Sequence, residues 1–297
     1  MRTITSTLAA TAPLALLLAL TSCGAPRDEA DDAASDTSSE SSETAAAEDC
    51  TKDSLETLAP GTLTVGTDSP AYEPWFVDDD PTNGQGYESA VAYAVAEQLG
   101  YAEDEVEWVT VPFNAVVSPG EKKFDFDVNQ VSITEQRKKA VDFSSGYYDV
   151  RQTVITNVGS PIDGATSLGE LADAKLGAQV GTTSYNAISE VIGSTEQAAA
   201  FDTNDQAVQA LNNGQIDGIV VDLPTAYFMT AVQLDKGTIV GQLPLPDGEV
   251  EQFGAVLDKD SPLTDCVSQA VDALREDGTL DQIASEWLEQ QGAPELS

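Results

Sequence analysis

The sequence contains no histidine and few cations for its length. Without histidine, a Ser-His-Asp triad, a Cys-His dyad and a zinc site with histidine ligands are all excluded. Lysine and arginine total 13 against 51 aspartates and glutamates, which gives a formal net charge of −38. Repulsion from so acidic a chain disfavours nucleic acid and anionic lipid as partners. With 297 residues, the chain is long enough for one large or two small domains with a real core.

The N-terminal segment has the features of an export signal. Arg2 supplies a positive start, the apolar run Ala9–Leu20 follows, and small residues precede Cys23. The run is shorter than the roughly 20 residues that a membrane-spanning helix needs. The four residues that end at Cys23, Leu-Thr-Ser-Cys, resemble the lipobox of lipoproteins. This resemblance implies a signal peptide over residues 1–22 and a lipidated Cys23, and the alternative is an ordinary secretory signal with a chance cysteine.

Residues 23–59 are predicted to form a disordered acidic tether. Between Gly24 and Asp49 the chain consists mainly of Ala, Ser, Thr, Asp and Glu, with Arg27 as its sole cation and no large apolar residue. Such a stretch cannot bury enough apolar surface to offset the entropy of ordering it. Its acidic groups repel one another, so we expect an extended linker that holds a domain away from a membrane.

Once Cys23 is assigned to lipidation, two of the three cysteines remain, Cys50 and Cys266. An even pair in an exported protein indicates a disulfide. Cys50 lies where the tether ends, and Cys266 lies in a stretch with apolar residues at helical spacing. The bond would join the start of the fold to its last third, and two unpaired thiols are the alternative.

From residue 61 onward, strand-like and helix-like stretches alternate, which is typical of an α/β fold with largely parallel sheets. Strands are predicted at Thr62–Gly66, Val106–Val111, Phe124–Ile133, Val150–Thr156, Leu176–Val180, Gly218–Val221, Thr238–Val240 and Phe253–Leu257. Helices are predicted at Glu88–Leu99, after Ser184, from Pro224 to about Ala231, at Ser261–Asp277 and at Leu280–Leu288. Gly159-Ser160-Pro161 separates two such units, which two crossing segments would join into a hinged pair of lobes.

The stretch Val128–Arg137, with the sequence VNQVSITEQR, is predicted to form an anion pocket. It sets the guanidinium of Arg137 near backbone amides and the Ser132 hydroxyl. A guanidinium is a planar fork of donors that can bind a carboxylate through two parallel hydrogen bonds. The alternative is that Arg137 belongs to a solvated charge cluster with Lys138 and Lys139.

This stretch resembles the family 3 solute-binding proteins, the amino-acid receptors of ABC importers, whose motif at this place reads small-x-Thr/Ser-x-Thr-x-x-Arg. Ser132, Thr134 and Arg137 occupy its last three fixed positions. The resemblance spans about residues 61–291 and implies a periplasmic-binding-protein-like type II fold, with two α/β lobes joined by a two-segment hinge. Residues 60–155 and 253–297 would form lobe 1, and residues 156–252 would form lobe 2. We expect the hinge near Thr153–Thr156 and Gln252–Ala255.

Two further motifs carry the rest of the clamp. At Gly181-Thr182-Thr183-Ser184 a strand gives way to a helix, whose free amides and dipole favour an anion. The resemblance implies that Thr183 donates to a substrate carboxylate, although Thr183 or Ser184 could also be a helix N-cap. Asp222 follows a strand with a buried pattern, and the resemblance implies that it receives an α-ammonium. Its alternative role is the N-cap of the helix that begins near Pro224.

The segment Gly66–Trp75 resembles the family motif Gly-Thr-Asp-x-x-Tyr-x-Pro-Phe, which covers the ligand. The resemblance implies ligand contacts for Asp68 and Tyr72, and also for Trp75, where Phe is usual and packing in the lobe core is the alternative. An aromatic face can cover an aliphatic stem or attract a cation. Gln130 stands where the family usually has Gly, so it adds a side chain to the pocket wall.

Together these features predict a monomeric, lipid-anchored receptor on the outer face of the cell membrane. It would bind an amino acid between its lobes and deliver it to ABC permease subunits, without catalytic residues, metal or cofactor, and without nucleic acid. A dehydratase-like enzyme on the same fold, acting on a small carboxylate, is the rival hypothesis. A structural or adhesive lipoprotein is a third class, but it would not need a charged clamp divided between two lobes.

Overall fold

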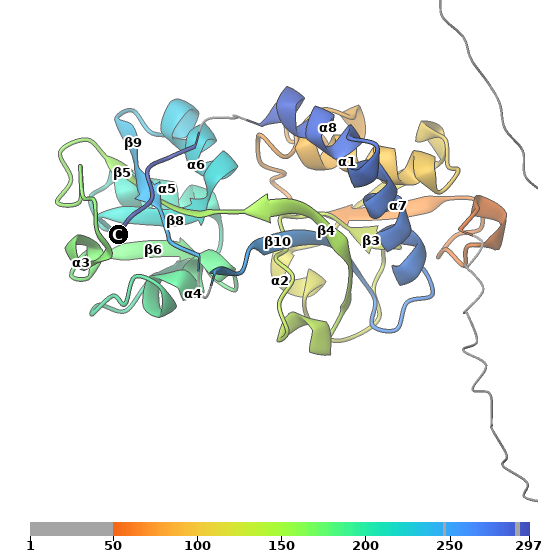
Figure 1. Ribbon diagram of the computed structural model, residues 1–297, viewed down its shortest axis with the longest axis horizontal. Helices are drawn as coiled ribbons and strands as arrows, with labels where there is room; N and C mark the ends of the chain where they lie inside the picture. The colour runs from red at the N-terminus through yellow and green to blue at the C-terminus, as the bar shows by residue number, and fades with distance from the viewer. Residues whose placement is uncertain (1–49, 246–247, 289–291) are drawn as a thin grey trace, which may run out of the picture. The chain divides into compact units, whose positions relative to one another are not determined.

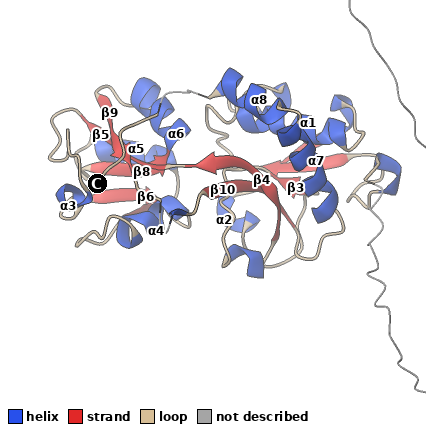
Figure 2. Ribbon diagram, in the orientation of Figure 1, coloured by secondary structure: helices blue, strands red, loops and turns tan. Residues whose placement is uncertain are grey.

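The structure is a computed structural model that describes residues 50–245, 248–288 and 292–297. The predicted signal peptide, Cys23 and the predicted tether up to residue 49 lie outside the described residues. Within those ranges, no helix is long and apolar enough to cross a membrane. The described chain builds two five-stranded sheets, each covered by helices (Figures 1 and 2).

The first sheet and the helices packed on it are called lobe 1. The strand order is β2-β1-β3-β10-β4, with β1 parallel to β2 and β3 and with β10 antiparallel to β3 and β4. The strands are β1 (Leu63–Thr67), β2 (Val106–Thr110), β3 (Phe126–Asp127), β4 (Asp142–Val150) and β10 (Glu251–Leu257). The helices are α1 (Tyr87–Gln98), α2 (Phe113–Val116), α7 (Thr264–Glu276) and α8 (Thr279–Trp287), with 3-10 turns η1 (Lys52–Ser54), η2 (Pro81–Asn83), η3 (Glu103–Glu105) and η4 (Arg137–Lys139).

The second sheet and its helices are called lobe 2. The strand order is β7-β6-β8-β5-β9, and β5 runs antiparallel to both of its neighbours. The strands are β5 (Gln152–Asn157), β6 (Leu176–Gln179), β7 (Ala199–Phe201), β8 (Gly218–Asp222) and β9 (Gly237–Gln242). The helices are α3 (Leu168–Leu171), α4 (Thr183–Glu190), α5 (Asn204–Asn212) and α6 (Leu223–Phe228), which continues into a π-helical turn, η5 (Met229–Gln233).

Each lobe has apolar clusters on both faces of its sheet, because successive strand residues point to opposite faces. Along β10, Ala255 and Leu257 belong to the cluster under α1 and α7, while Val256 belongs to the cluster beside α2. Along β8, Ile219 packs with α5 and α6, while Val220 packs with α4. Burial on both faces explains why these strands read as continuous apolar runs.

Two segments connect the lobes. Strand β4 ends at Val150 and β5 begins at Gln152, so a single residue separates a strand of one sheet from a strand of the other. The chain returns between the end of β9 at Gln242 and the start of β10 at Glu251 (Figure 1). The predicted architecture of two α/β lobes with two crossing segments is confirmed.

The last residues of the chain lie against lobe 2, beside the C label in Figure 1. Glu295 forms a parallel bridge with Gln242, and the Leu296 side chain packs in the apolar cluster around β6 and α4. Residues 292–297 are therefore an addition to lobe 2, whereas the division inferred from the sequence assigned them to lobe 1.

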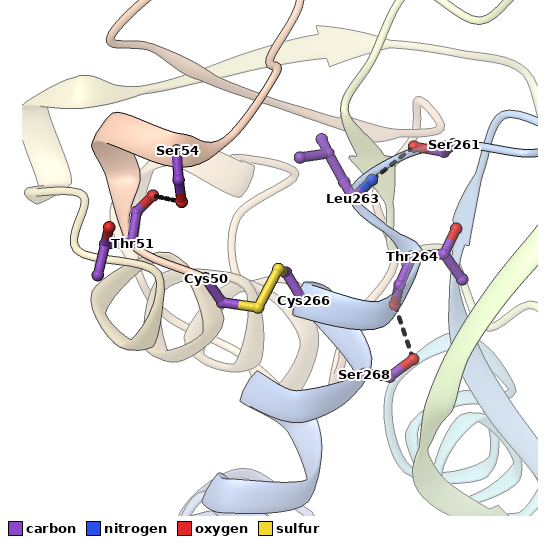
Figure 3. The surroundings of a disulfide bond; sticks show 8 residues. All are labelled: Cys50, Thr51, Ser54, Ser261, Leu263, Thr264, Cys266 and Ser268. Carbon is purple, nitrogen blue, oxygen red and sulfur yellow. Dashed lines mark hydrogen bonds between the residues drawn. A yellow bond between two sulfur atoms is a disulfide. The ribbon is translucent and has the colours of Figure 1, made fainter. Parts of the chain in front are cut away.

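Cys50 and Cys266, which are 216 positions apart in sequence, are joined by a disulfide (Figure 3). Cys266 lies on the buried face of α7 with Val267, Ala270 and Val271, which is the helical spacing that the sequence predicts. The bond links the beginning of the described chain to a helix that packs on β4 and on α1.

Two strand predictions need correction. The predicted strand Phe124–Ile133 is a regular strand only at β3 and returns to the sheet as an isolated bridge between Ser132 and Phe253, because between them Gln130 adopts a positive φ of 48° and its N–H donates to the Glu88 carboxylate. The predicted strand Val150–Thr156 is two strands, since the chain changes sheets at Arg151. Strand β4 and helix α5 were not predicted.

Candidate functional site

A cavity of about 600 Å³, counting the part open to solvent, lies between the two lobes. Lobe 1 contributes Asp68, Tyr72, Gln130, Ser132 and Arg137 to its wall, and lobe 2 contributes Thr183 and Asp222. Sequence motifs nominated these residues from four separate stretches, and the structure brings them together at one place. Trp75 is the exception, because it does not line the cavity.

Arg137 stands at the boundary between the lobes. It begins the turn η4, and its Nη1 donates to the Ser132 carbonyl at 2.7 Å while its Nη2 donates to the Gly181 carbonyl of lobe 2 at 3.0 Å. The guanidinium also lies over the Phe113 ring, 5.5 Å from its centroid. Burial lowers the pKa of Arg137 to about 10, and the charge of Glu251 opposes this shift. The group therefore stays a cation at neutral pH and has donors to spare.

Gly181 lies where the two lobes approach each other. It adopts a φ of +83°, which glycine tolerates and other residues rarely do. A Cβ at this position would lie 2.6 Å from Asn114 Oδ1 of lobe 1. A side chain here would strain the backbone and displace the Asn114 side chain.

The Ser132 and Thr183 hydroxyls meet across the cleft, with their oxygens 3.1 Å apart. Thr183 Oγ1 donates to Glu251 Oε1 at 2.6 Å, because a carboxylate can only accept. Ser132 is consequently the donor to Thr183. Gln152 Nε2 adds hydrogen bonds of 3.2 Å to Thr183 and to both oxygens of Glu251, so the hydroxyl of Thr183 is held in one orientation.

Thr183 is the first residue of helix α4, and Thr182 is the residue that caps it. The Thr182 hydroxyl accepts from the Tyr185 N–H at 3.1 Å, so neither Thr183 nor Ser184 is the N-cap. Ser184 instead donates to Gln152 Oε1 at 2.7 Å. The first amides of a helix have no partner within it, and they make this end of α4 favourable for an anion.

Asp222 occupies both positions that the sequence analysis offered as alternatives. It lines the cavity, and it is the N-cap of α6, where its Oδ1 accepts from the Thr225 N–H at 2.9 Å. Burial raises the pKa of Asp222 to about 6, while hydrogen bonds from Thr225 act in the opposite direction. A cation placed next to this half-buried carboxylate would favour its ionised form.

Asp68 and Tyr72 lie on the same wall of the cavity. Asp68 is held in place by the Ser69 N–H at 2.7 Å and by the Phe113 N–H at 3.0 Å, one on each carboxylate oxygen. Burial and the nearby charge of Asp205 raise the pKa of the Tyr72 hydroxyl to about 12, so this group is neutral at physiological pH.

Gln130 projects into the wall from a strained backbone position, with a φ of +48°. The fully buried Glu88 carboxylate holds it, since it accepts the Gln130 N–H at 2.7 Å and also hydrogen-bonds the Gln130 Nε2 and the Tyr147 hydroxyl. Burial raises the pKa of Glu88 to about 7, although these hydrogen bonds lower it. The sequence predicted Gln130 in the pocket wall, but it did not predict that Glu88 would hold it there.

The structure corrects the predicted role of Trp75 as a ligand contact. Its side chain is fully buried in the core of lobe 1, against the rings of Tyr87, Tyr148 and Phe253. The indole is therefore too deep to touch a ligand in this cavity. Phe253 does line the cavity and separates the indole from it.

Some wall residues were not nominated from the sequence. Asn129 lines the cavity, and its buried Nδ2 has no hydrogen-bond partner within the described part of the chain. Asn129 stands next to Gln130 within the predicted anion-pocket stretch Val128–Arg137, so it could have been nominated from the sequence. Phe113 and Gln152 also line the cavity, but they belong to no motif in the sequence. Across the described residues, no cluster of three or more His, Cys, Asp or Glu side chains could hold a metal ion.

The two lobes and the polar cavity between them define a class, the two-lobed binding proteins of the type II periplasmic fold. The chain belongs to the bacterial extracellular solute-binding proteins, family 3, which it matches over residues 63–290. The predicted family and fold class are thereby confirmed.

Named relatives support this membership. The arginine-binding extracellular protein ArtP of Bacillus subtilis is 27% identical over 236 residues, which cover 76% of this chain and 86% of ArtP. The structure of an ancestral arginine-binding protein bound to glutamine has a TM-score of 0.64 and 30% identity, covering 77% of this chain and 98% of that one. The ancestral amino acid-binding protein AncCDT-1, described as a precursor of cyclohexadienyl dehydratase, has a TM-score of 0.61 and 30% identity, with coverages of 77% and 96%.

Proposed function

We propose that this protein is the substrate-binding lipoprotein of an ABC importer, and that it binds an amino acid in the cavity between its lobes. The observation that carries the proposal is the half-buried Arg137 guanidinium, which faces the N-terminal end of helix α4 across the cleft. A cation and free helix amides on opposite walls make a site for one carboxylate. The relatives that bear the names of arginine- and amino acid-binding proteins support the substrate class.

In this proposal, the ligand carboxylate pairs with Arg137 and with the Ser132 and Thr183 side of the cavity. The ligand ammonium meets Asp222, whose charge has no hydrogen-bonded cationic partner among the described residues. Tyr72 and Asp68 border the remaining space, which would take the ligand side chain. An acidic residue there favours a neutral or cationic side chain over an acidic one.

Binding would close the lobes by a hinge motion at the two crossing segments, around Arg151 and residues 242–251, since Thr153–Thr156 and Gln252–Ala255, where the sequence put the hinge, lie inside strands β5 and β10. Ligand bonds to both lobes exist only in the closed form, so they shift the population towards it. The ABC permease would then receive the closed, loaded receptor, which acts as a monomer.

The rival enzyme hypothesis takes its support from the likeness to AncCDT-1. Two observations favour binding over catalysis. The chain has no histidine to act as a general base. Of the acids whose pKa is strongly raised, Glu88 and Asp127 are fully buried and lie outside the cavity wall, and Asp222, which does line it, is held as the N-cap of α6.

The proposal also places the protein outside the cytoplasm, anchored by a lipid on Cys23 and held off the membrane by the acidic tether. The lipobox resemblance and the tether composition support this part. Cys23→Ala should release the protein into the medium or leave its precursor unprocessed. Metabolic labelling of that variant with fatty acid, at the level of the wild type, would contradict the anchor.

The function is tested by a thermal-shift screen of the twenty amino acids, L-cystine and L-ornithine, followed by calorimetric titration of each hit. We expect at least one amino acid to bind, and mass analysis after long incubation should recover it unchanged. Binding of none of these compounds would contradict the receptor proposal, and a chemically altered hit would favour the enzyme.

A further inference from the structure

Trp75 lies in the core of lobe 1 and directs its one polar atom at lobe 2. The rings of Tyr87, Tyr148 and Phe253 surround the indole edge-on, at centroid distances of 5.8, 5.3 and 5.5 Å. These contacts fix the plane of the ring. Its Nε1–H donates to Thr225 Oγ1, 2.9 Å away at the start of helix α6.

The chemistry of this hydrogen bond determines where the Thr225 proton goes. An indole N–H can only donate, so the Thr225 oxygen accepts from Trp75 and keeps its own proton for another acceptor. The neighbouring Asp222 carboxylate accepts the Thr225 N–H at 2.9 Å, and the Thr225 side chain lowers the pKa of Asp222, so the two groups lie close together. The indole thus fixes the Thr225 side chain beside the carboxylate that lines the cavity.

We propose that Trp75 is a positioning residue that couples lobe closure to amino-acid binding, acting through Thr225 on Asp222. This inference rests on the proposed function, because it takes Asp222 as the partner of the ligand ammonium. Trp75 and Thr225 belong to different lobes, so their hydrogen bond exists only while the lobes are together. A contact made only in the closed form raises its population, and the apparent affinity rises with that population.

The identity of residue 75 matters for this role. The resemblance in the Gly66–Trp75 segment leads us to expect Phe, which has an aromatic ring but no N–H to donate. Thr225 is 3% exposed, so water cannot readily replace the indole as its donor while the lobes are closed. A substitution by Phe at this position therefore removes the donor and leaves most of the ring packing.

Trp108 provides a matched control. Its Nε1 donates to the Tyr93 hydroxyl at 3.2 Å, and its ring packs edge-on against Phe76, all within lobe 1. Trp108→Phe removes the same kind of hydrogen bond without touching the boundary between the lobes. Any effect that comes only from losing an indole N–H should appear equally in both variants.

The affinity experiment titrates wild type, Trp75→Phe, Trp108→Phe and Thr225→Val with L-arginine, and with each other amino acid that binds wild type in the screen. We expect Trp75→Phe to weaken binding about three- to tenfold, the range for loss of one neutral hydrogen bond. Trp108→Phe should stay within about twofold of wild type. Thr225→Val should bind at least as weakly as Trp75→Phe. The double variant Trp75→Phe with Thr225→Val should bind no more weakly than Thr225→Val alone, because both substitutions remove the same hydrogen bond.

A spectroscopic measurement separates this role from general packing. In a protein whose only tryptophan is Trp75, made by Trp108→Phe and Trp287→Phe, a saturating amino acid should lower the acrylamide quenching of its fluorescence. Adding Thr225→Val should remove much of that protection. Equal quenching with and without the amino acid would overturn the coupling.

The remaining outcomes are also decisive. If wild type binds an amino acid while Trp75→Phe binds it equally well, the inference fails and the proposed function stands. If Trp75→Phe and Trp108→Phe weaken binding equally, Trp75 has only a packing role and the inference fails. If wild type binds none of the screened amino acids, the proposed function fails, and this inference, which rests on it, fails as well.

Discussion

The Thr183 hydroxyl donates to Glu251 Oε1 at 2.6 Å, so a carboxylate of the protein already accepts this proton at the boundary of the cavity. Glu251 begins strand β10, on the return crossing, and its charge also acts on Arg137. The ligand carboxylate and Glu251 would therefore compete for the same donors. A ligand carboxylate would rely on Arg137 and on the amides of α4 more than on the Thr183 hydroxyl.

Glu251→Gln should strengthen amino-acid binding. The amide keeps an acceptor for Thr183 but removes a negative charge near the ligand carboxylate, a gain of about 1–2 kcal/mol at the dielectric of a protein surface. Calorimetric titration measures the change. Glu249→Gln, at an exposed position two residues earlier, is the control and should change affinity by less than about 0.5 kcal/mol. Weaker binding by Glu251→Gln would show that its charge supports the site.

Asp222 should make amino-acid affinity depend on pH. With a pKa of about 6 in the free protein, its carboxylate is largely protonated at pH 5 and ionised at pH 7. The charge of Glu251 raises the pKa of Asp222 further, and the neighbouring titratable groups Tyr148 and Glu88, whose pKa values burial raises, are not cations either. Affinity should rise about tenfold from pH 5 to a plateau above pH 7, because the ligand ammonium needs the ionised form.

Asp222→Asn isolates this effect. The variant should bind an amino acid about 2–4 kcal/mol more weakly at pH 7.5 and lose the rise with pH, since the charged partner is gone. A des-amino analogue of the same ligand should be affected much less. Equal losses for both ligands in the titrations would mean that Asp222 acts only as the helix cap.

Glu88 should make stability fall as pH rises. Its pKa is about 7 in the fold against an ordinary value of 4.5, so the folded state holds a proton that the unfolded state has lost between these values. The contribution of Glu88 to the free energy of unfolding is therefore largest below about pH 4.5, and it falls by roughly 3 kcal/mol between there and about pH 7. Urea unfolding of wild type and Glu88→Gln from pH 5 to 8 measures the difference in slope.

Glu97→Gln, on the exposed side of the same helix, is the control for the stability measurement. Its pH profile should follow that of wild type. Parallel profiles for wild type and Glu88→Gln would contradict the assignment of this titration to Glu88.

The disulfide should contribute to stability because it closes a loop of 216 residues in the unfolded chain. In a Cys23→Ser background, alkylation of the denatured, unreduced protein should find no free thiol. Cys50→Ser with Cys266→Ser should lower the free energy of unfolding by about 2–4 kcal/mol. Two alkylated thiols without reductant would contradict the bridge.

The sequence was informative where one local pattern determines the structure. Helix α7 follows from the spacing of Val267, Ala270 and Val271, and the two lobes follow from the alternation of strands and helices. Arg137 and Thr183 could be nominated because each belongs to a short motif at the end of an element. Thr183 and Asp222 meet because they follow the parallel neighbours β6 and β8 at one edge of the second sheet, whereas Arg137 reaches them from lobe 1 only because the lobes face each other.

Other features depend on contacts between distant segments, which no local pattern encodes. Trp75 matched a ligand-covering motif, yet its partners Tyr148, Phe253 and Thr225 come from three other parts of the chain. Glu251 carries no motif, and its closeness to Thr183 appears only once the return crossing is placed.

The most direct test of the account is the affinity of Arg137→Ala for the tightest-binding amino acid of the screen, measured by calorimetric titration beside Lys139→Ala. In the proposed complex, Arg137→Ala would remove a charge-assisted partner of the ligand carboxylate in a half-buried site, and it should cost about 2–5 kcal/mol of binding free energy. Lys139 is exposed in the same turn, and its substitution should leave binding unchanged within about 0.5 kcal/mol. If Arg137→Ala binds as tightly as wild type, Arg137 serves only to join the lobes through the Ser132 and Gly181 carbonyls, and the carboxylate clamp does not exist.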